Sequence, residues 1–347
     1  APVYAILPGE VTLSSALWLS VKHPDGFVVS YLHIYKSDRL VDVGDQVTAG
    51  QQIGKVGNVP PSGGCHLDLR INVANNTNAE VAKPFQVINV IDEPGTIQFG
   101  RMLAVVDVSG RAAFREYNLA PTIEGQALHA GVSEVFAQDN SWAKIKTFQD
   151  WGKGEIYDVS TKRVAIARDA HARWFPIHLG GHLTKQTLDI ITTEQGADMR
   201  HNGLYITEGD EHLDLFTTDL HESRDTTGDT VWKGAATGNS RASYEGLIEI
   251  VEGATNSHTY LQTHSLMLSR NAKVDAIPSL IVKVDDVSAS HGGTVGEVDE
   301  DQVFYMRTRG IPREQAIQIL IEGYFEPVIT LFEDEHLETM VRERIAG

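Results

Sequence analysis

Hydrophobic and polar positions follow one pattern in the first 83 residues. Short apolar runs alternate there with glycine-rich turns, as in small antiparallel sheets. The run "GFVVSYLHIY" (26–35) predicts a strand, and "LVDVGDQVTAGQQIGKVGN" (40–58) alternates Val and Ile with polar residues, which predicts an antiparallel hairpin. The polar run "NVANNTNAEVAKP" (72–84) predicts a connection.

A second pattern begins near residue 84. Between about residues 155 and 305 the chain lacks helical periodicity, and β-rich runs are separated by similar corners, "EQGADM" (194–199), "VEGATN" (251–256) and "SRNAKV" (269–274). Many short strands with regular turns are typical of a sandwich or a solenoid. A glycine or asparagine followed by a small residue suits the tight corner of a β-helix turn, so the pattern favours the solenoid.

The C-terminal tail has helical spacing. The run "IPREQAIQILIEGYF" (311–325) predicts a helix that begins near Pro312 and that Pro327 ends. Its apolar face consists of Ala316, Ile317, Leu320, Ile321, Tyr324 and Phe325. A second helix is predicted from Leu331, Phe332, Leu337, Met340 and Val341. Such a pair either packs on the β domain or docks a partner, and the pattern alone favours packing.

Length, charge and cysteine content narrow the function. The 347 residues suggest two domains, and the net charge of −18 falls almost entirely after residue 83, since residues 1–83 hold six Lys/Arg against seven Asp/Glu. An acidic surface argues against nucleic-acid binding. No apolar run is long enough for a membrane span, and "APVYAILPGE" is unlike a signal peptide. Cys65 is the only cysteine, which excludes internal disulfides and thiolate-only metal sites.

Residues 1–80 resemble LytM/lysostaphin-type zinc endopeptidases, which cut peptidoglycan cross-bridges. The resemblance is carried by "SYLHIY", "VDVGDQVTAGQQIGKVGN" and "SGGCHLDLRI". In that family an upstream H-x-x-x-D motif and the second histidine of H-x-H hold the metal. His33 and His66 match the two helper histidines, whereas Asp68 replaces the ligand histidine and the upstream motif is absent. A catalytic zinc needs about three protein ligands, so the resemblance implies a degenerate site without zinc. Cys65 beside it has no visible activating base.

Residues 79–347 resemble the SufB/SufD family of iron–sulfur cluster assembly proteins, and SufD most. The resemblance is carried by long motifs that include "HLGGHLTKQTLDI", "GDEHLDLFTTDLHES", "TVWKGAATGNSRASYEGLI" and "KVDAIPSLIVKVDDVSASHGGTVGEVDEDQVFYMRTRGIPREQA". It implies a right-handed parallel β-helix (79–308) followed by a short C-terminal helical domain (309–347). Together with the degenerate peptidase-like module (1–78), which is expected to be small and antiparallel, the chain is predicted to be mainly β.

His291 is the main candidate of the SufD-like part. It lies between a serine and two glycines, in a stretch whose polar, glycine-rich end predicts a turn. In the family this segment lies where two β-helix subunits meet, and its histidine is implicated in receiving the nascent cluster. The implied cluster and interface residues are Ser290, His291, Gly292 and Gly293, with iron on His291. On sequence chemistry alone, a histidine satisfied by a turn carbonyl is the alternative.

The resemblance also implies partners. SufB has a cysteine two positions before the matching histidine, where this chain has Ala289, so the chain contributes at most one side of a transient iron–sulfur cluster shared with a SufB-like subunit. The C-terminal helices would dock a SufC-like ATPase, and the candidate contacts are Ile317, Leu320, Ile321, Tyr324 and Phe325. The chain has no Walker-type loop, so ATP hydrolysis would belong to that partner.

Other polar residues have two interpretations each. A series of histidines suggests either a metal-ligand ladder or ordinary outward strand positions, and we favour the second; they are His129, His171, His178, His182, His201, His212, His221, His258 and His264. Acidic residues around His291 suggest a solvated rim that would also attract ferrous iron; they are Asp285, Asp286, Glu297, Asp299, Glu300 and Asp301.

The sequence therefore predicts a non-catalytic, cytoplasmic SufD-like scaffold subunit that needs no bound cofactor of its own. It would pair with a SufB-like chain or with itself through the β-helix edge. The alternative is a cell-wall zinc endopeptidase, or its inactive binding module, acting through residues 1–80. A third hypothesis has residues 1–80 bind glycan or protein while the β-helix serves as a platform. The two resemblances imply different compartments and meet near residues 75–84, which suggests a fusion, a chimera or a sequence-assembly accident.

Overall fold

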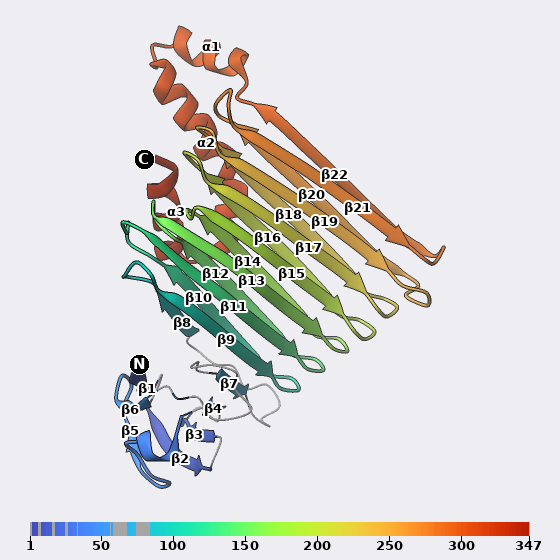
Figure 1. Cartoon of the computed structure of the whole chain (residues 1–347). Coiled ribbons are helices and arrows are strands. Elements are labelled where there is room, and N and C mark those ends of the chain that lie inside the picture. The colour runs from blue at the N-terminus through green and yellow to red at the C-terminus, as the bar shows by residue number, and fades with distance from the viewer. Residues whose placement is uncertain are drawn as a thin grey trace.

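The computed structural model describes residues 2–346 except 6–7, 16–17, 25–26, 33, 56, 58–67 and 74–83. The chain is mainly β, with a small antiparallel module, a parallel β-solenoid of about seven turns and a short helical tail (Figure 1). This architecture confirms the predicted fold class.

The N-terminal module is built from short strands around a shared apolar core. Its strands are β1 (Pro2–Tyr4), β2 (Gly9–Ser14), β3 (Trp18–Lys22), β4 (Phe27–Leu32), β5 (Gln46–Val47), β6 (Gln52–Lys55) and β7 (Asp68–Val73). The strand predicted within residues 26–35 is β4. The predicted hairpin is wrong, because β5 pairs with β2 while β6 pairs with β1. Val47 and Ile53 are both buried. The alternating pattern therefore predicted correctly which side chains are buried, but not which strands pair.

The solenoid consists of two facing parallel sheets. One contains β8 (Phe85–Val90), β10 (Arg111–Leu119), β12 (Trp142–Asp150), β14 (His171–Leu179), β16 (Asp198–Thr207), β18 (Thr227–Ala236), β20 (Ser257–Met267) and β22 (Val287–Glu297). The other contains β9 (Ile97–Val106), β11 (Gln126–Ala137), β13 (Glu155–Ile166), β15 (Leu183–Thr192), β17 (His212–His221), β19 (Arg241–Ile250) and β21 (Lys273–Val282). Each strand pairs with the next but one in sequence, so the chain passes from sheet to sheet (Figure 1).

The predicted corners lie at turns between the sheets. Gly196 and Gly253 have φ values of +77° and +88°, a conformation that glycine adopts without steric cost. The alanine that follows each glycine, Ala197 or Ala254, is completely buried. A larger side chain at either alanine would need space that the packed corner lacks, so the sequence pattern is explained by packing.

Equivalent positions stack along the solenoid because the parallel registers continue from turn to turn. One inward-facing row of the even-numbered sheet consists of Phe85, Phe114, Ile145, Trp174, His201, Thr230, Leu261 and His291. All its members except His291 are buried between the two sheets. The row therefore begins in an aromatic core and ends at the last turn with an exposed imidazole.

The odd-numbered sheet continues into the N-terminal module. Strand β7 pairs in parallel with β9, from Asp68 opposite Arg101 to Val73 opposite Val106, and β7 is also antiparallel to β4. The first solenoid turn therefore has a hydrogen-bonded neighbour in this sheet. The predicted domain boundary at residues 78 and 79 lies outside the described residues.

The helical tail packs on the outer face of the even-numbered sheet. It consists of α1 (Glu300–Thr308), α2 (Arg313–Ile329), a 3-10 turn (Thr330–Phe332) and α3 (Glu335–Ala346) (Figure 1). The helix predicted to begin near Pro312 is α2, whose N-cap is Pro312. The prediction that Pro327 ends the helix is wrong, because Val328 and Ile329 continue α2 and are buried against the solenoid. Their burial offsets the hydrogen bond that a proline removes. No helix in the described part of the chain combines the length and apolarity needed to cross a bilayer.

Candidate functional site at the open end of the solenoid

The last turn of the solenoid is uncovered. Strands β21 and β22 are the terminal strands of their sheets, so each has one edge without a strand partner among the described residues. Side chains that would be core in an earlier turn are partly exposed here: Val274, Leu280, Val282, Val287, Ala289 and Val295. Unpaired strand edges and exposed core positions are features that proteins normally cover. We call this surface the open end.

His291 lies at the centre of the open end. It belongs to β22, directly above the fully buried Leu261, and faces the space between the two sheets. Its imidazole is exposed because the described part of the chain forms no further turn over it. The predicted turn in this glycine-rich stretch is wrong, since β22 is one strand of 11 residues. A strand at an uncovered end has little core to fill, which explains how it tolerates so many glycines.

The neighbours of His291 differ in orientation. Ser290 pairs with Tyr260 in an outward-facing row, so it does not share the inward face. A Cβ atom at Gly293 would lie 3.3 Å from Thr263, whereas one at Gly292 would meet nothing within 4 Å. Gly292 therefore has free space beside it, and we expect alanine at this position to fold normally.

The predicted acidic rim is divided between the two ends of β22. Asp285 and Asp286 precede the strand, whereas Glu297 ends it and the remaining carboxylates follow. Asp299 is the N-cap of α1, where its carboxylate accepts hydrogen bonds from the backbone N–H groups of Asp301 and Gln302. These backbone bonds, with one from the Gln302 side chain, hold the pKa of Asp299 below its usual value. A strand of this length spans about 36 Å, so the two acidic groups are well separated.

Several histidines are inside the solenoid, contrary to the outward positions that we favoured. His129, His178, His201 and His221 are at most 3 % exposed. Burial lowers the pKa of His178 and His201 to about 3 and that of His221 to about 4, so these imidazoles are neutral at pH 7. Within the described ranges, no group of three or more His, Cys, Asp or Glu side chains is arranged to hold a metal ion.

A buried ion pair lies deeper in the solenoid, and sequence reasoning did not find it. Lys162 Nζ is 2.8 Å from Glu116 Oε1, and both side chains are at most 6 % exposed. Asn118 and Ser133 also donate to this carboxylate. Burial alone would raise the pKa of Glu116, but Lys162 and the hydrogen bonds from Asn118 and Ser133 together hold the pKa below its usual value. The two partners come from strands in opposite sheets, so this pair joins the sheets through the interior.

The residues predicted to dock an ATPase are divided between the interior and the surface. Ile321 and Phe325 are buried against the outer face of the even-numbered sheet, and Ile317 and Tyr324 are partly buried there. Leu320 is also partly buried. In this arrangement the packing role predicted from pattern alone applies to Ile321 and Phe325. The most exposed apolar side chains of α1 and α2 are instead Phe304, Tyr305 and Ile319.

The tail is attached to the solenoid by charge as well as by apolar packing. Asp334, between the 3-10 turn and α3, is 8 % exposed and contacts Arg115 Nη2 at 2.5 Å and Lys146 Nζ at 3.2 Å. Next to it, Glu333 pairs with Lys144 at 2.5 Å, but the Glu333 side chain is 73 % exposed. The two neighbouring carboxylates therefore differ strongly in burial.

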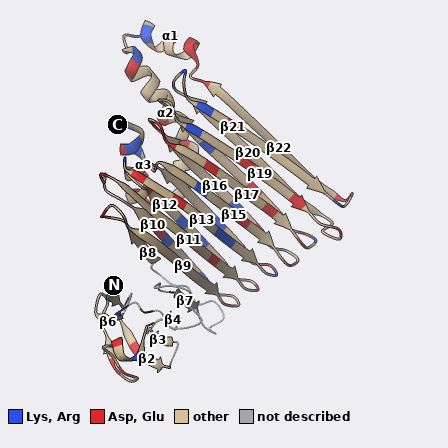
Figure 2. Cartoon of the chain, viewed as in Figure 1, with Lys and Arg blue, Asp and Glu red and all other residues tan. Residues whose placement is uncertain are grey.

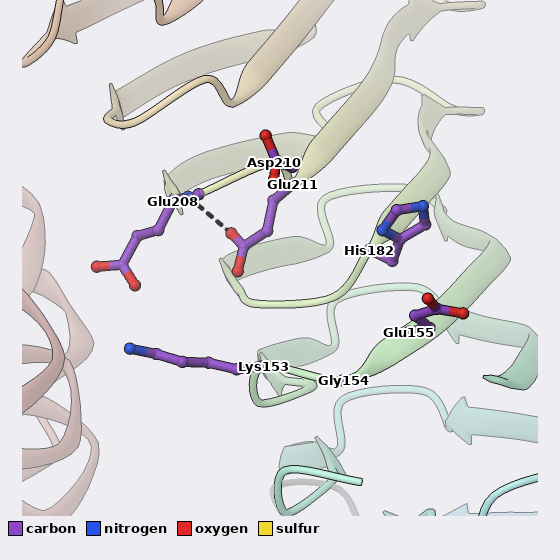
Figure 3. A pocket seen from close by; sticks show the side chains of 8 residues that line it. Lys153, Gly154, Glu155, His182, Glu208, Asp210 and Glu211 are labelled. Atoms are coloured by element: carbon purple, nitrogen blue, oxygen red, sulfur yellow. Dashed lines mark hydrogen bonds between the residues drawn. The ribbon is translucent and has the colours of Figure 1, made fainter. Parts of the chain in front are cut away.

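A charged pocket of about 290 Å³ lies at a solenoid corner. Its titratable side chains come from three successive turns: Lys153, Glu155, His182, Glu208, Asp210 and Glu211 (Figure 3). Burial raises the pKa of Glu211 to about 7, and its carboxylate accepts a hydrogen bond from the Glu208 backbone at 2.8 Å. Arg344 of α3 pairs with Glu208 at 3.2 Å, so the tail also contacts a residue that lines this pocket.

The structure describes only one of the residues assigned to the degenerate peptidase site. His33, Cys65 and His66 lie outside the described residues, and Asp68 is the first residue of β7. The structure therefore gives no geometry for the degenerate peptidase site.

The fold places this chain in the class of parallel β-solenoid proteins, here with a helical tail on one sheet and an uncovered last turn. The family model "SUF system FeS cluster assembly, SufBD core domain" matches residues 89–324, which is more than half of the chain. The chain belongs to the SufBD family of iron–sulfur cluster assembly proteins. A second model, for peptidase family M23, matches residues 1–81.

Curated relatives give the same assignment. The chain is 26 % identical over 270 residues to an iron–sulfur cluster assembly SufBD family protein of Mycobacterium leprae, covering 78 % of this chain and 29 % of the relative. A SufBD family protein of Porphyra purpurea is 27 % identical over 277 residues, covering 78 % and 54 %. One of Antithamnion sp. is 28 % identical over 239 residues, covering 67 % and 80 %. The chain thus spans only part of the first two relatives.

Proposed function

We propose that this chain is a SufD-like scaffold subunit in cytoplasmic iron–sulfur cluster assembly. It would act with a SufB-like subunit and a SufC-like ATPase, and the cluster would be transient and shared. The observation that carries the proposal is His291 at the open end, where an exposed imidazole is surrounded by unpaired strand edges and partly exposed core side chains.

The open end suits a partner that is itself the end of a β-sheet. Its edges offer backbone hydrogen bonds, and its apolar side chains gain burial when covered. A second solenoid placed there would bring its own last turn close to His291. The same geometry suits a second copy of this chain, so the proposal includes a homodimer as the alternative assembly.

The SufBD core of this chain needs a partner that supplies thiolate ligands for a cluster. Its single cysteine, Cys65, lies outside the SufBD core, so residues 89–324 supply no thiolate for a cluster. His291 would contribute an imidazole ligand, and the partner would supply thiolates. The ATPase would dock on helices α1 and α2 of the tail, where Phe304, Tyr305 and Ile319 are the exposed apolar contacts.

The test is co-purification with SufB-like and SufC-like partners, followed by anaerobic reconstitution with ferrous iron and sulfide. His291→Ala should leave the complex intact and lower the cluster absorbance, because only the ligand is removed. His212→Ala is the matched control, since His212 is an exposed strand histidine on the outer face of the other sheet. Equal cluster absorbance in both variants would contradict the role of His291.

The assembly surface has its own test. Val282→Asp places a charge at the open end, where Val282 is 41 % exposed, and should prevent partner binding or self-association. Val159→Asp is the control, because Val159 is 50 % exposed in the middle of the odd-numbered sheet, away from the open end. Sedimentation of each variant with and without partner measures the effect. Partner binding that survives Val282→Asp would refute the proposed surface.

The match of residues 1–81 to peptidase family M23 supports a second candidate function, a cell-wall zinc endopeptidase or its inactive binding module. Zinc content and peptidoglycan release, measured on the same preparation, test it. Stoichiometric zinc with peptidoglycan cleavage, in a chain that binds no SufB-like partner, would favour this candidate over the scaffold.

A further inference from the structure

Lys233 is a partly buried cation without a counter-charge. In residues 85–346, seven other Lys or Arg side chains are buried or partly buried, and each forms an ion pair: Arg115, Lys144, Lys146, Lys162, Arg173, Arg342 and Arg344. No carboxylate among the described residues pairs with Lys233. Charged residues of both signs are interspersed along the strands (Figure 2), and even the exposed Lys185 pairs with Asp214 at 2.5 Å. Because desolvated charges are normally paired, the exception needs an explanation.

The environment of Lys233 is a groove of about 510 Å³ between α2 and the outer face of the even-numbered sheet. Lys233, His264 and Thr294 occupy the same row on strands β18, β20 and β22, and all three line the groove. Val231 and Leu266 provide apolar lining. None of the described residues that line the groove is Asp or Glu. Its volume is within the range of small-molecule sites.

The polar groups of the groove have spare donor capacity. Lys233 Nζ donates one hydrogen bond to the Tyr324 backbone carbonyl at 2.5 Å and lies 4.6 Å from the centre of the Tyr324 ring. An ammonium has three donors, so two remain without a partner among the described residues. His264 Nδ1 is 2.7 Å from Thr294 Oγ1, whereas His264 Nε2 is 3.5 Å from Gln262 Oε1, at the limit of a hydrogen bond.

We propose that this groove binds a small ligand that carries an oxyanion, phosphate or carboxylate, on an apolar body. The oxyanion supplies the counter-charge that Lys233 lacks and accepts its two free N–H groups. His264 is a second donor through Nε2 in its neutral Nε2–H tautomer, in which Nδ1 accepts a hydrogen bond from Thr294 Oγ1. Val231 and Leu266 contact the apolar body. The inference rests on the groove alone and is independent of the proposed role in cluster assembly.

The test is a ligand titration of the full chain, monitored by NMR of 13C-labelled histidine rings and by the thermal unfolding midpoint. The probes are inorganic phosphate, phenyl phosphate and benzoate, with sodium chloride at matched ionic strength. We expect saturable shifts of the His264 signal, which His264→Gln assigns, and no shift of His212 on the opposite sheet. Tighter binding of phenyl phosphate than of inorganic phosphate would identify the apolar contact, and comparison with benzoate separates phosphate from carboxylate.

Lys233→Met is the decisive variant, because it keeps the aliphatic stem and removes the charge. It should keep the unfolding midpoint in chloride and weaken probe binding at least about tenfold, since a charge-assisted hydrogen bond is lost. Lys185→Met, the exposed control, should bind as the wild type does. Thr294→Val removes the hydroxyl that donates to His264 Nδ1 and favours the Nε2–H tautomer, so it should weaken probe binding without changing the charge of the groove. Absence of saturable shifts, equal binding by Lys233→Met, or an equal response to chloride would overturn the proposal.

Discussion

The attachment of the helical tail depends on Asp334, and Asp334→Asn isolates the contribution of its charge. The carboxylate contacts Arg115 Nη2 at 2.5 Å and Lys146 Nζ at 3.2 Å, and the Lys146 side chain is 7 % exposed. Asp334 Oδ1 also accepts a 3.4 Å hydrogen bond from the Leu337 backbone N–H at the start of α3. Asparagine is an equally good N-cap residue, so the substitution keeps the cap and removes the charge.

The expected cost of Asp334→Asn is about 2–4 kcal/mol. Removing one partner of a fully buried pair costs about 3–5 kcal/mol, and an exposed pair contributes about 0–1 kcal/mol. The pair with Lys146 is a buried pair, whereas Arg115 is 24 % exposed, so its pair with Asp334 is intermediate between buried and exposed. The loss should be local, because the tail packs on the finished solenoid and can open without unfolding it.

Hydrogen exchange of the α3 amides measures this opening directly. Asp334→Asn should raise the exchange rates of α3 and leave those of the central solenoid strands unchanged. Glu333→Gln is the matched control, since its pair with Lys144 is largely exposed and should contribute less than about 1 kcal/mol. Equal exchange in the two variants would refute the claim that the buried charge holds the tail in place.

Lowering the pH should open α3 in the same way as Asp334→Asn, because protonation also removes the charge of Asp334. Burial alone would raise the pKa of Asp334, but Lys146 and Arg115 hold it below the ordinary 3.8. A lowered folded-state pKa means that the stabilisation is complete above 3.8 and is lost as pH falls through the folded value. In the wild type, the protection factors of the α3 amides, which are exchange rates corrected for the intrinsic rate at each pH, should therefore fall below pH 3.8. Asp334→Asn should lack this decrease.

Three further perturbations test the interior of the solenoid. Gly234→Ala places a Cβ atom on the Tyr205 ring in the core, so urea unfolding should show a loss of about 3 kcal/mol or more. His201→Leu should flatten the loss of stability as pH falls from 6.5 toward 3, because the wild-type imidazole has a pKa of about 3 when folded and 6.5 when unfolded; thermal unfolding at several pH values measures it. Lys162→Met should cost about 3–5 kcal/mol in urea unfolding, and adding Glu116→Leu should recover most of it.

The solenoid was predictable because its signals are local. Each corner combines a turn residue with a small residue, and both are visible in a few letters of sequence. The failures concern properties that are not local. The stretch 40–58 has the alternation of a hairpin, yet its strands pair with β1 and β2, which lie far earlier in the chain. Pro327 has the local chemistry of a helix end, but burial of the next two residues keeps α2 intact.

The functional residues show the same limit. His291 could be named from its motif, but its inward orientation depends on a register carried through eight strands. Lys233, His264 and Thr294 are unremarkable in sequence, because each comes from a different turn and only the stacked registers bring them together. Nor does any pattern distinguish Asp334 from Glu333, since their difference in burial arises when the tail meets the solenoid.

The two ends of the solenoid differ in a way that limits how a partner can bind. At the first turn, β7 of the N-terminal module pairs with β9 and extends the odd-numbered sheet. At the last turn, β21 and β22 have no such neighbour among the described residues, and partly exposed core side chains surround His291. A partner that binds this sheet by adding strands to its edge therefore has the β21 edge available, whereas the β9 edge is already paired. For a partner that extends the odd-numbered sheet, this asymmetry predicts one preferred orientation of the proposed assembly, in which the N-terminal module points away from the partner.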